Sequence, residues 1–278
     1  MQIRTEHWDF RARAAGPEDG RPVLLLHGFP QTSRAWVPVM DALAGAGRRA
    51  VAFDQRGYSP GARPDDPEAY APESLVGDVL EVADALDWDR FDLVGHDFGG
   101  AIAWMVAGHH PDRVRTVSVA STPHPAAFRA SYRSGEGDQH QRSGYMRTFR
   151  EAPRGEPEAQ LLADGAALLR AAYDGLPAEV VDEYVAHLSE PGAMVAAVDW
   201  YRSMSGAASA ATPPSPVPTL YVWSDQDPAL GRDAAEATAA LVTGPYRFEV
   251  LEGINHWIPE LAADRFAALL LAHLGAHD

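Results

Sequence analysis

Short apolar runs recur along the chain, and helical spacing of apolar residues separates several of them. Runs of this kind predict strands that are buried on both faces. They lie at Val23–Leu26, Arg49–Phe53, Phe91–Val94, Val114–Ala120, Thr219–Trp223 and Tyr246–Leu251.

Helical spacing is found at Ser33–Ala44 and Ser74–Leu86, where Ser33 and Ser74 are suitable N-caps, and again at Glu260–Leu274 near the end of the chain. Strands that alternate with helices predict an α/β protein with a parallel, doubly wound sheet. The ligand crevice of such a sheet lies beyond the carboxyl ends of its strands, so chemistry is expected there.

The alternation stops between about Ala127 and Ala211, where helical patterns occur at Pro157–Tyr173, Pro177–Leu188 and Gly192–Met204 without strand candidates. The stretch predicts a helical cap inserted into the sheet domain. We expect residues 1–126 and 214–278 to form the core and residues 127–213 the cap. A connector rich in Pro, Ala and Ser, Gly206–Pro218, would join the cap to the next strand.

Composition narrows the possible partners. The 278 residues are 46% hydrophobic, enough for one core with an insertion, and the net charge of −16 leaves no basic stripe for nucleic acid or anionic membranes. Met1–Phe10 has no signal-peptide pattern and no long apolar run predicts a membrane span, so a cytoplasmic protein is expected. The chain has no cysteine, which leaves its redox compartment undetermined. Arg as the only basic residue besides His, with heavy use of Ala, is typical of GC-rich bacterial genomes. The sequence does not decide whether the protein forms a homodimer.

The sequence FDLVGH, Asp97, FGG and a helical pattern matches a nucleophile elbow, in which a sharp strand-to-helix turn presents one side chain above the sheet. An Asp here is already ionised and attacks carbon without a general base. Attack at an sp3 carbon leaves an ester that water can hydrolyse, so the pattern favours an epoxide or an alkyl halide as substrate. The alternative is an inactive relative in which Asp97 only caps a helix.

Hydrolysis of that ester needs a base, and His256 follows the last predicted strand, where such a base is usual. Asp227, after the strand Thr219–Trp223, is favoured to orient His256, and Asp225 is the competitor. A lone His is often only structural, and either Asp could merely cap the turn before Pro228.

The segment HGFP ends the first predicted strand. In an elbow architecture the backbone amides of Phe29 and Phe98 would form the oxyanion hole. Alternatively, HGFP is only the turn that ends the strand and has no catalytic role. Whether the Phe29–Pro30 bond is cis is left open, because trans is the usual form.

With these motifs the chain resembles the epoxide hydrolase family of α/β-hydrolases, whose elbow commonly reads GHDWGG. The resemblance covers nearly the whole chain and includes HGFP, DQRGYSPGARP, STPHP and the His256 loop. It implies two cap tyrosines that bind the epoxide oxygen, and Tyr145 in GYMRTFRE and Tyr201 in DWYRSM match them. Each tyrosine could instead be an ordinary packing residue of a cap helix.

Phe98 departs from the family, which commonly has Trp after the nucleophile. Haloalkane dehalogenases use that indole N–H to hold the departing halide, so Phe98 argues against a dehalogenase. The second alternative to an epoxide hydrolase is a non-catalytic receptor for small molecules. Aromatic neighbours suggest a hydrophobic or aromatic epoxide, and predicted substrate contacts are Trp104, Phe149, Trp200 and His124. No metal-binding or nucleotide-binding motif is present, so no cofactor is expected.

Overall fold

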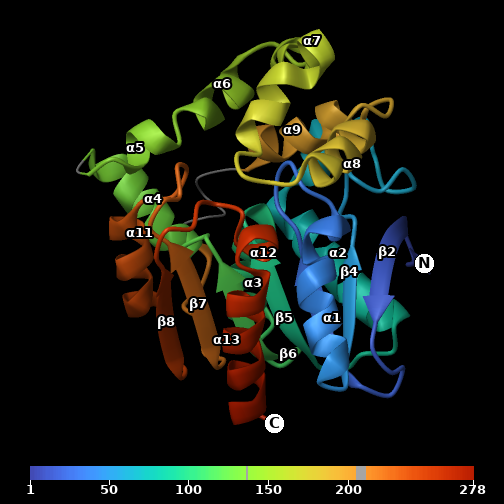
Figure 1. The fold of residues 1–278 in the computed structure, drawn as a ribbon, viewed down its shortest axis with the longest axis vertical. Helices are drawn as coiled ribbons and strands as arrows, with labels where there is room; N and C mark the ends of the chain where they lie inside the picture. The colour runs from blue at the N-terminus through green and yellow to red at the C-terminus, as the bar shows by residue number, and fades with distance from the viewer. Residues whose placement is uncertain (136, 205–210) are drawn as a thin grey trace.

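The computed structural model describes residues 1–135, 137–204 and 211–278, and its described part is built on an eight-stranded sheet (Figure 1). The order is β1-β2-β4-β3-β5-β6-β7-β8; the β1–β2 and β2–β4 pairs are antiparallel, and all other neighbouring strands pair in parallel. The strands are β1 Gln2–Arg4, β2 Asp9–Ala15, β3 Arg21–Leu26, β4 Arg48–Phe53, β5 Phe91–His96, β6 Val114–Ala120, β7 Thr219–Ser224 and β8 Tyr246–Leu251.

All six strands expected from the apolar runs are present, so the predicted parallel, doubly wound sheet is confirmed. β1 and β2 were not anticipated. In β2 only Phe10 and Ala12 are fully buried, and arginines alternate with them, so this strand lacks a continuous apolar run. It pairs antiparallel with β4 near the edge of the sheet, where alternation is the expected pattern.

Helices cover both faces of the sheet (Figure 1). Helices α1 (Val37–Gly45) and α13 (Ala263–Ala276) pack on one face with Val23 and Leu25 of β3. Helices α2 (Pro72–Ala85) and α3 (Phe98–His109) pack on the other face with Leu24 and Leu26. Successive side chains of one strand therefore serve two apolar cores, which explains why the central strands read as unbroken apolar runs.

Three helix boundaries differ from the prediction. A 3-10 turn, η1 (Ser33–Trp36), precedes α1, and Thr32 caps it by accepting a hydrogen bond from the Arg34 amide. Helix α2 begins at Pro72, so Ser74 lies within its first turn and does not cap it; proline is favoured at a first helical position because it has no N–H to satisfy. The last helix is divided at Ala262 into α12 (Ile258–Leu261) and α13.

A group of helices lies between β6 and β7 in sequence and gathers above the sheet in the view of Figure 1. The three helices predicted in this stretch are present within two residues of their expected ends; α7 contains a non-helical break at residues 163–166. The helices are α4 Pro125–Ser134, α5 Gln139–Arg142, α6 Tyr145–Glu151, α7 Glu156–Ala172, α8 Ala178–Leu188 and α9 Ala193–Ser203.

The first part of the predicted connector, residues 206–210, lies outside the described residues. The remaining short elements are η2 Pro67–Tyr70, α11 Arg232–Ala237 and η3 Thr238–Leu241. Among the described helices, none has the length and apolar character that a membrane crossing requires.

Candidate active site

The turn between β5 and α3 holds Asp97 in an unusual backbone conformation. Its φ is 52° and its ψ is −123°, a combination that L-residues rarely adopt. A side chain at Gly95 would overlap the backbone of Gly99, and one at Gly28 would overlap the Asp97 side chain. Glycine at these positions lets the turn close tightly, and Asp97 is presented at the carboxyl end of the sheet.

Three side chains from separate loops meet at this point. The His256 Nε2 atom lies 3.5 Å from Oδ2 of Asp97, and His256 Nδ1 lies 2.8 Å from Oδ2 of Asp227. The other Asp227 oxygen accepts hydrogen bonds from the amides of Ala229 and Leu230. The carboxylate of Asp227 is therefore fixed, and it holds the imidazole with Nε2 facing Asp97.

The competing residue Asp225 is placed elsewhere. It is partly exposed, and its Oδ1 accepts a hydrogen bond of 2.7 Å from the amide of Gly253. Asp225 thus fastens the loop that carries His256, whereas the fully buried Asp227 contacts the imidazole itself. This geometry favours Asp227 as the orienting acid.

The electrostatics distinguish His256 from its neighbours. Burial acts against the charge of His256, but Asp227 and then Asp97 outweigh it and raise its pKa to about 10. Burial lowers the pKa of His27 to about 4, of His96 to about 3 and of His124 to about 4, so these rings are neutral at pH 7.

Asp97 shows the complementary shift. Burial alone would raise its pKa, but hydrogen bonding to His256, the charge of His256 and the Phe98 amide together bring the pKa below the usual value. Asp97 is therefore a carboxylate in the resting protein, and its charge is balanced by an imidazolium.

The two Asp97 oxygens have different surroundings. Oδ1 accepts a hydrogen bond of 2.8 Å from the backbone amide of Phe29, and the amide of Phe98 also bonds the carboxylate. Oδ2 faces His256. Both predicted oxyanion donors thus bond the Asp97 carboxylate, the Phe29 amide at Oδ1, while Oδ2 lies on the side of His256. The Phe29–Pro30 bond, left open above, is cis.

Two tyrosines from the helices above the sheet line the same cavity as Asp97, which has a volume of about 350 Å³. Tyr201 of α9 is almost fully buried; Tyr145 of α6 has 38% of its surface accessible. Their ring centroids are 5.9 Å apart. Burial raises the pKa of both hydroxyls, and the charge of Asp97 raises both further, so each hydroxyl stays protonated and able to donate.

Residues 21–263 match the model of the family described as the alpha/beta hydrolase fold. Epoxide hydrolase A of Mycobacterium tuberculosis (strain ATCC 25618 / H37Rv) is 30% identical over 92% of this chain and 91% of its own length. The chain belongs to the epoxide hydrolase family of the alpha/beta hydrolase fold. Epoxide hydrolase 4 of Mus musculus, another relative, is 29% identical over 99% of this chain and 78% of its own length.

Solved structures of epoxide hydrolases also superimpose on the chain. The crystal structure of epoxide hydrolase A from Mycobacterium thermoresistibile has a TM-score of 0.88 and 26% identity, and it covers 100% of this chain and 98% of its own. An epoxide hydrolase structure from metagenomes of hot environments has the same TM-score and identity. The family model and the relatives confirm the family expected from the motifs.

The four residues predicted to contact substrate do not line the cavity that holds Asp97. They are Trp104, Phe149, Trp200 and His124. Trp104 donates to the carbonyl of Thr122, Trp200 to that of Arg56, and His124 Nε2 bonds Pro213. The ring of Phe149 packs on Tyr145 and Tyr201. Such positions suit residues that hold the cavity wall from behind, and direct substrate contact stays a prediction for them.

Sequence reasoning missed most of the cavity wall, which includes Thr122, Pro123, Phe128, Tyr132, Met146, Met204 and Leu230. Only the STPHP motif, which contains Thr122 and Pro123, gave a signal near this surface. Phe128, Tyr132 and Met146 come from helices whose orientation depends on tertiary packing, so helical periodicity could not identify them. Met204 and Leu230 lie outside the helices of the structure, where helical periodicity does not apply.

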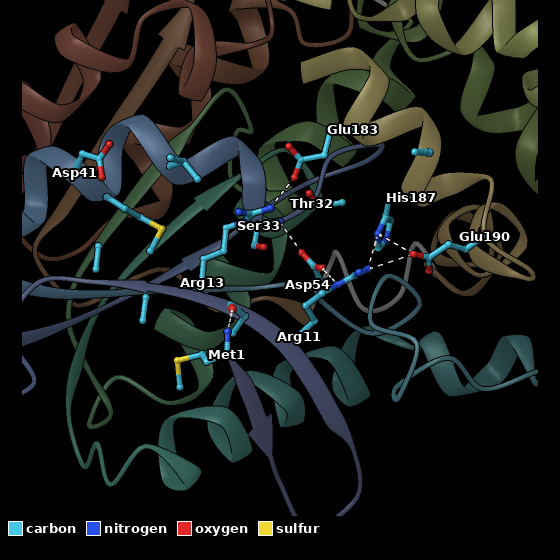
Figure 2. Close-up of a pocket in the computed structure, with 16 residues that line it drawn as sticks. Met1, Arg11, Arg13, Thr32, Ser33, Asp41, Asp54, Glu183, His187 and Glu190 are labelled. Atoms are coloured by element: carbon cyan, nitrogen blue, oxygen red, sulfur yellow. Dashed lines mark hydrogen bonds and ion pairs between the residues drawn. The ribbon is translucent and has the colours of Figure 1, made fainter. Parts of the chain in front are cut away.

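A larger hollow, of about 710 Å³, lies where α8 meets β2 and the loop after β3 (Figure 2). Most of its charged groups pair with one another, as Arg11 does with Asp54 at 2.7 Å and Arg13 with Glu183 at 2.6 Å. Asp97 is not among its lining residues, so the smaller cavity is the candidate active site. No cluster of His, Asp or Glu within the described ranges is arranged to hold a metal ion.

Proposed function

We propose that the protein hydrolyses an epoxide to a vicinal diol through a covalent ester on Asp97. The observation that carries this proposal is a single cavity that contains both an ionised Asp97 and the two tyrosines, with His256 directly beside the carboxylate. The names of the relatives agree with it, since several are epoxide hydrolases.

In the first half-reaction, Oδ2 of Asp97 attacks one ring carbon, and the ring C–O bond breaks. Tyr145 and Tyr201 hydrogen-bond the ring oxygen, and one of them supplies the proton that turns the leaving oxygen into a hydroxyl. The product of this step is a hydroxyalkyl ester of Asp97. Oδ1 becomes the ester carbonyl and keeps its place beside the amide of Phe29; the amide of Phe98 also bonds this carboxyl group.

In the second half-reaction, His256 takes a proton from water, and the water oxygen attacks the ester carbonyl carbon. The amides of Phe29 and Phe98 stabilise the oxyanion, and Asp227 stabilises the imidazolium. Collapse breaks the bond between the carbonyl carbon and Oδ2, and the imidazolium of His256 gives its proton to Oδ2, which leaves as the second hydroxyl of the diol. The proton that remains on the new Asp97 carboxyl group restores the tyrosine hydroxyl. Asp97 retains the water oxygen.

The dehalogenase alternative is less well supported, because Phe98 offers only its backbone amide and no indole N–H for a departing halide. A non-catalytic receptor is disfavoured because it would need neither the aligned His256 and Asp227 nor the paired tyrosines. We further propose residues 127–213 as a cap on a core of residues 1–126 and 214–278, a cytoplasmic location, and a substrate with a hydrophobic body.

The test is a single turnover in ¹⁸O-labelled water with enzyme in excess over a small panel of epoxides. The label should enter the Asp97 carboxylate and should be absent from the first diol, then appear in diol on later turnovers. Peptide mass spectrometry locates the label. Label in the first-turnover diol would mean direct attack of water on the ring and would refute the covalent route.

A further inference from the structure

Three arginines line the same cavity as Asp97. Arg129 and Arg133 lie one helical turn apart on α4, and Arg150 lies on α6. Arg133 and Arg150 are exposed, so they stand on the solvent side of the cavity, whereas Arg129 is half-buried. Positive charge is thus gathered on one side of the cavity in a chain whose net charge is −16.

Arginines elsewhere in the described structure mostly bind a carboxylate, as Arg11 binds Asp54 and Arg56 binds Asp78. Within the described residues, none of the three cavity arginines has a hydrogen bond or an ion pair with the protein, and the Nε atom of Arg129 is buried without a partner. A buried donor without an acceptor is costly, so an absent partner is the simplest account of this arrangement.

We propose that Arg129, Arg133 and Arg150 bind an anionic group of the substrate, so that the substrate class is an epoxide that carries a carboxylate or a phosphate ester. The inference rests on the proposed function of Asp97 and names the substrate for that site. A guanidinium binds a carboxylate or a phosphate ester with two parallel hydrogen bonds. The feature that the two substrate classes share, and that the arginines would recognise, is the negatively charged group.

The rest of the cavity suits such a molecule. Phe128, Met146, Met204 and Leu230 give it apolar walls for the body of the substrate. Asp97 is itself negative and repels a second anion, whereas the arginines attract one. The two charges together would orient the molecule with its anionic end at the arginines and its ring at Asp97.

The test compares each epoxide acid with its neutral methyl ester, in a series of epoxyalkanoic acids of increasing chain length, with a phosphate-bearing epoxide as a second arm. We expect kcat/KM of the wild-type protein to favour the acid over the ester by about tenfold at low salt, and less as ionic strength rises. Arg129→Gln and Arg150→Gln should reduce this acid-to-ester ratio.

Arg147→Gln is the matched control. Arg147 is exposed on α6, has no partner among the described residues and is not among the residues that line the cavity, so its loss should leave the acid-to-ester ratio unchanged. An equal ratio in wild-type protein and in the Arg129 and Arg150 variants would refute the anion site. So would an equal decrease in the Arg147 variant, because it would indicate a general effect of net charge.

Binding separates this proposal from the proposed function. The cyclopropane analogue of the best acid cannot be opened, and calorimetry can compare its affinity with that of its methyl ester. Tighter binding of the acid that is lost in Arg129→Gln would support the anion site even if no epoxide were turned over. Equal binding of acid and ester would refute the anion site even if epoxides were hydrolysed.

Discussion

The charge of Asp97 should control the protonation of His256, and Asp97→Asn tests this directly. Asparagine has nearly the shape of aspartate but no charge, so it imitates the electrostatics of the ester intermediate. Because the Asp97 carboxylate helps raise the pKa of His256, its removal should lower that pKa. Formation of the ester would therefore release the proton and provide the neutral base that hydrolysis needs.

The size of the effect follows from the pKa of about 10 for His256 in the resting protein. At a pH of about 7.5 only about one imidazole in 300 is neutral with that pKa, whereas about nine in ten are neutral at the reference pKa. Asp227 stays in place and contributes more than Asp97, so the full shift is not expected. A decrease of at least about one unit, or roughly 1.4 kcal/mol, is expected for Asp97→Asn.

The measurement is an NMR titration of the His256 ring in wild-type protein and in the variant. Asp225→Asn is the control, because Asp225 contacts the Gly253 amide and not the imidazole. Asp227→Asn should lower the pKa of His256 further than Asp97→Asn does. An unchanged pKa of His256 in Asp97→Asn would refute the idea that alkylation of Asp97 makes His256 give up its proton and become a base.

Three further predictions concern the half-reactions. Tyr145→Phe and Tyr201→Phe should each slow ester formation by roughly tenfold to a thousandfold, and non-additively, because both donors act on one oxygen; unchanged rates in rapid-quench experiments would remove the preference for an epoxide over a halide. His256→Gln should still form the ester but hydrolyse it slowly, so intact mass should rise by one substrate; a folded, substrate-binding variant without the adduct would contradict this division. Gly28→Ala should displace Asp97 and abolish adduct formation, whereas Gly45→Ala, where the added methyl meets nothing within 4 Å, should not; equal adduct formation in both would show that the close approach is unimportant.

The central sheet was predictable because its physical signal is local. A parallel strand buried on both faces must be apolar at every position, and runs such as Val114–Ala120 meet that condition over their whole length. The N-terminal strands could not be found in this way. β2 is held by its pairing with β4, a contact between residues far apart in sequence, and its arginines hide the pattern.

The site divides in the same way. Asp97 follows β5 directly and His256 lies in the loop after β8, so the sheet places both at its carboxyl edge and their meeting could be anticipated. Trp104 was predicted to contact substrate as one of several aromatic residues that suit a hydrophobic or aromatic epoxide. It is a residue of α3, however, whose fully buried indole donates to Thr122 behind the cavity. Residue type alone does not determine which face of a helix meets a cavity.

Tyr145 and Tyr201 come from the helices between β6 and β7, whereas Asp227 and His256 come from loops of the sheet. Under the proposed mechanism, ring opening and ester hydrolysis are then encoded in different stretches of the chain. Mutations that accumulate in the helices can change which rings are opened while the hydrolytic step is inherited intact. Chimaeras that exchange these helices between relatives are therefore a direct route to enzymes with new substrates and an unchanged second step.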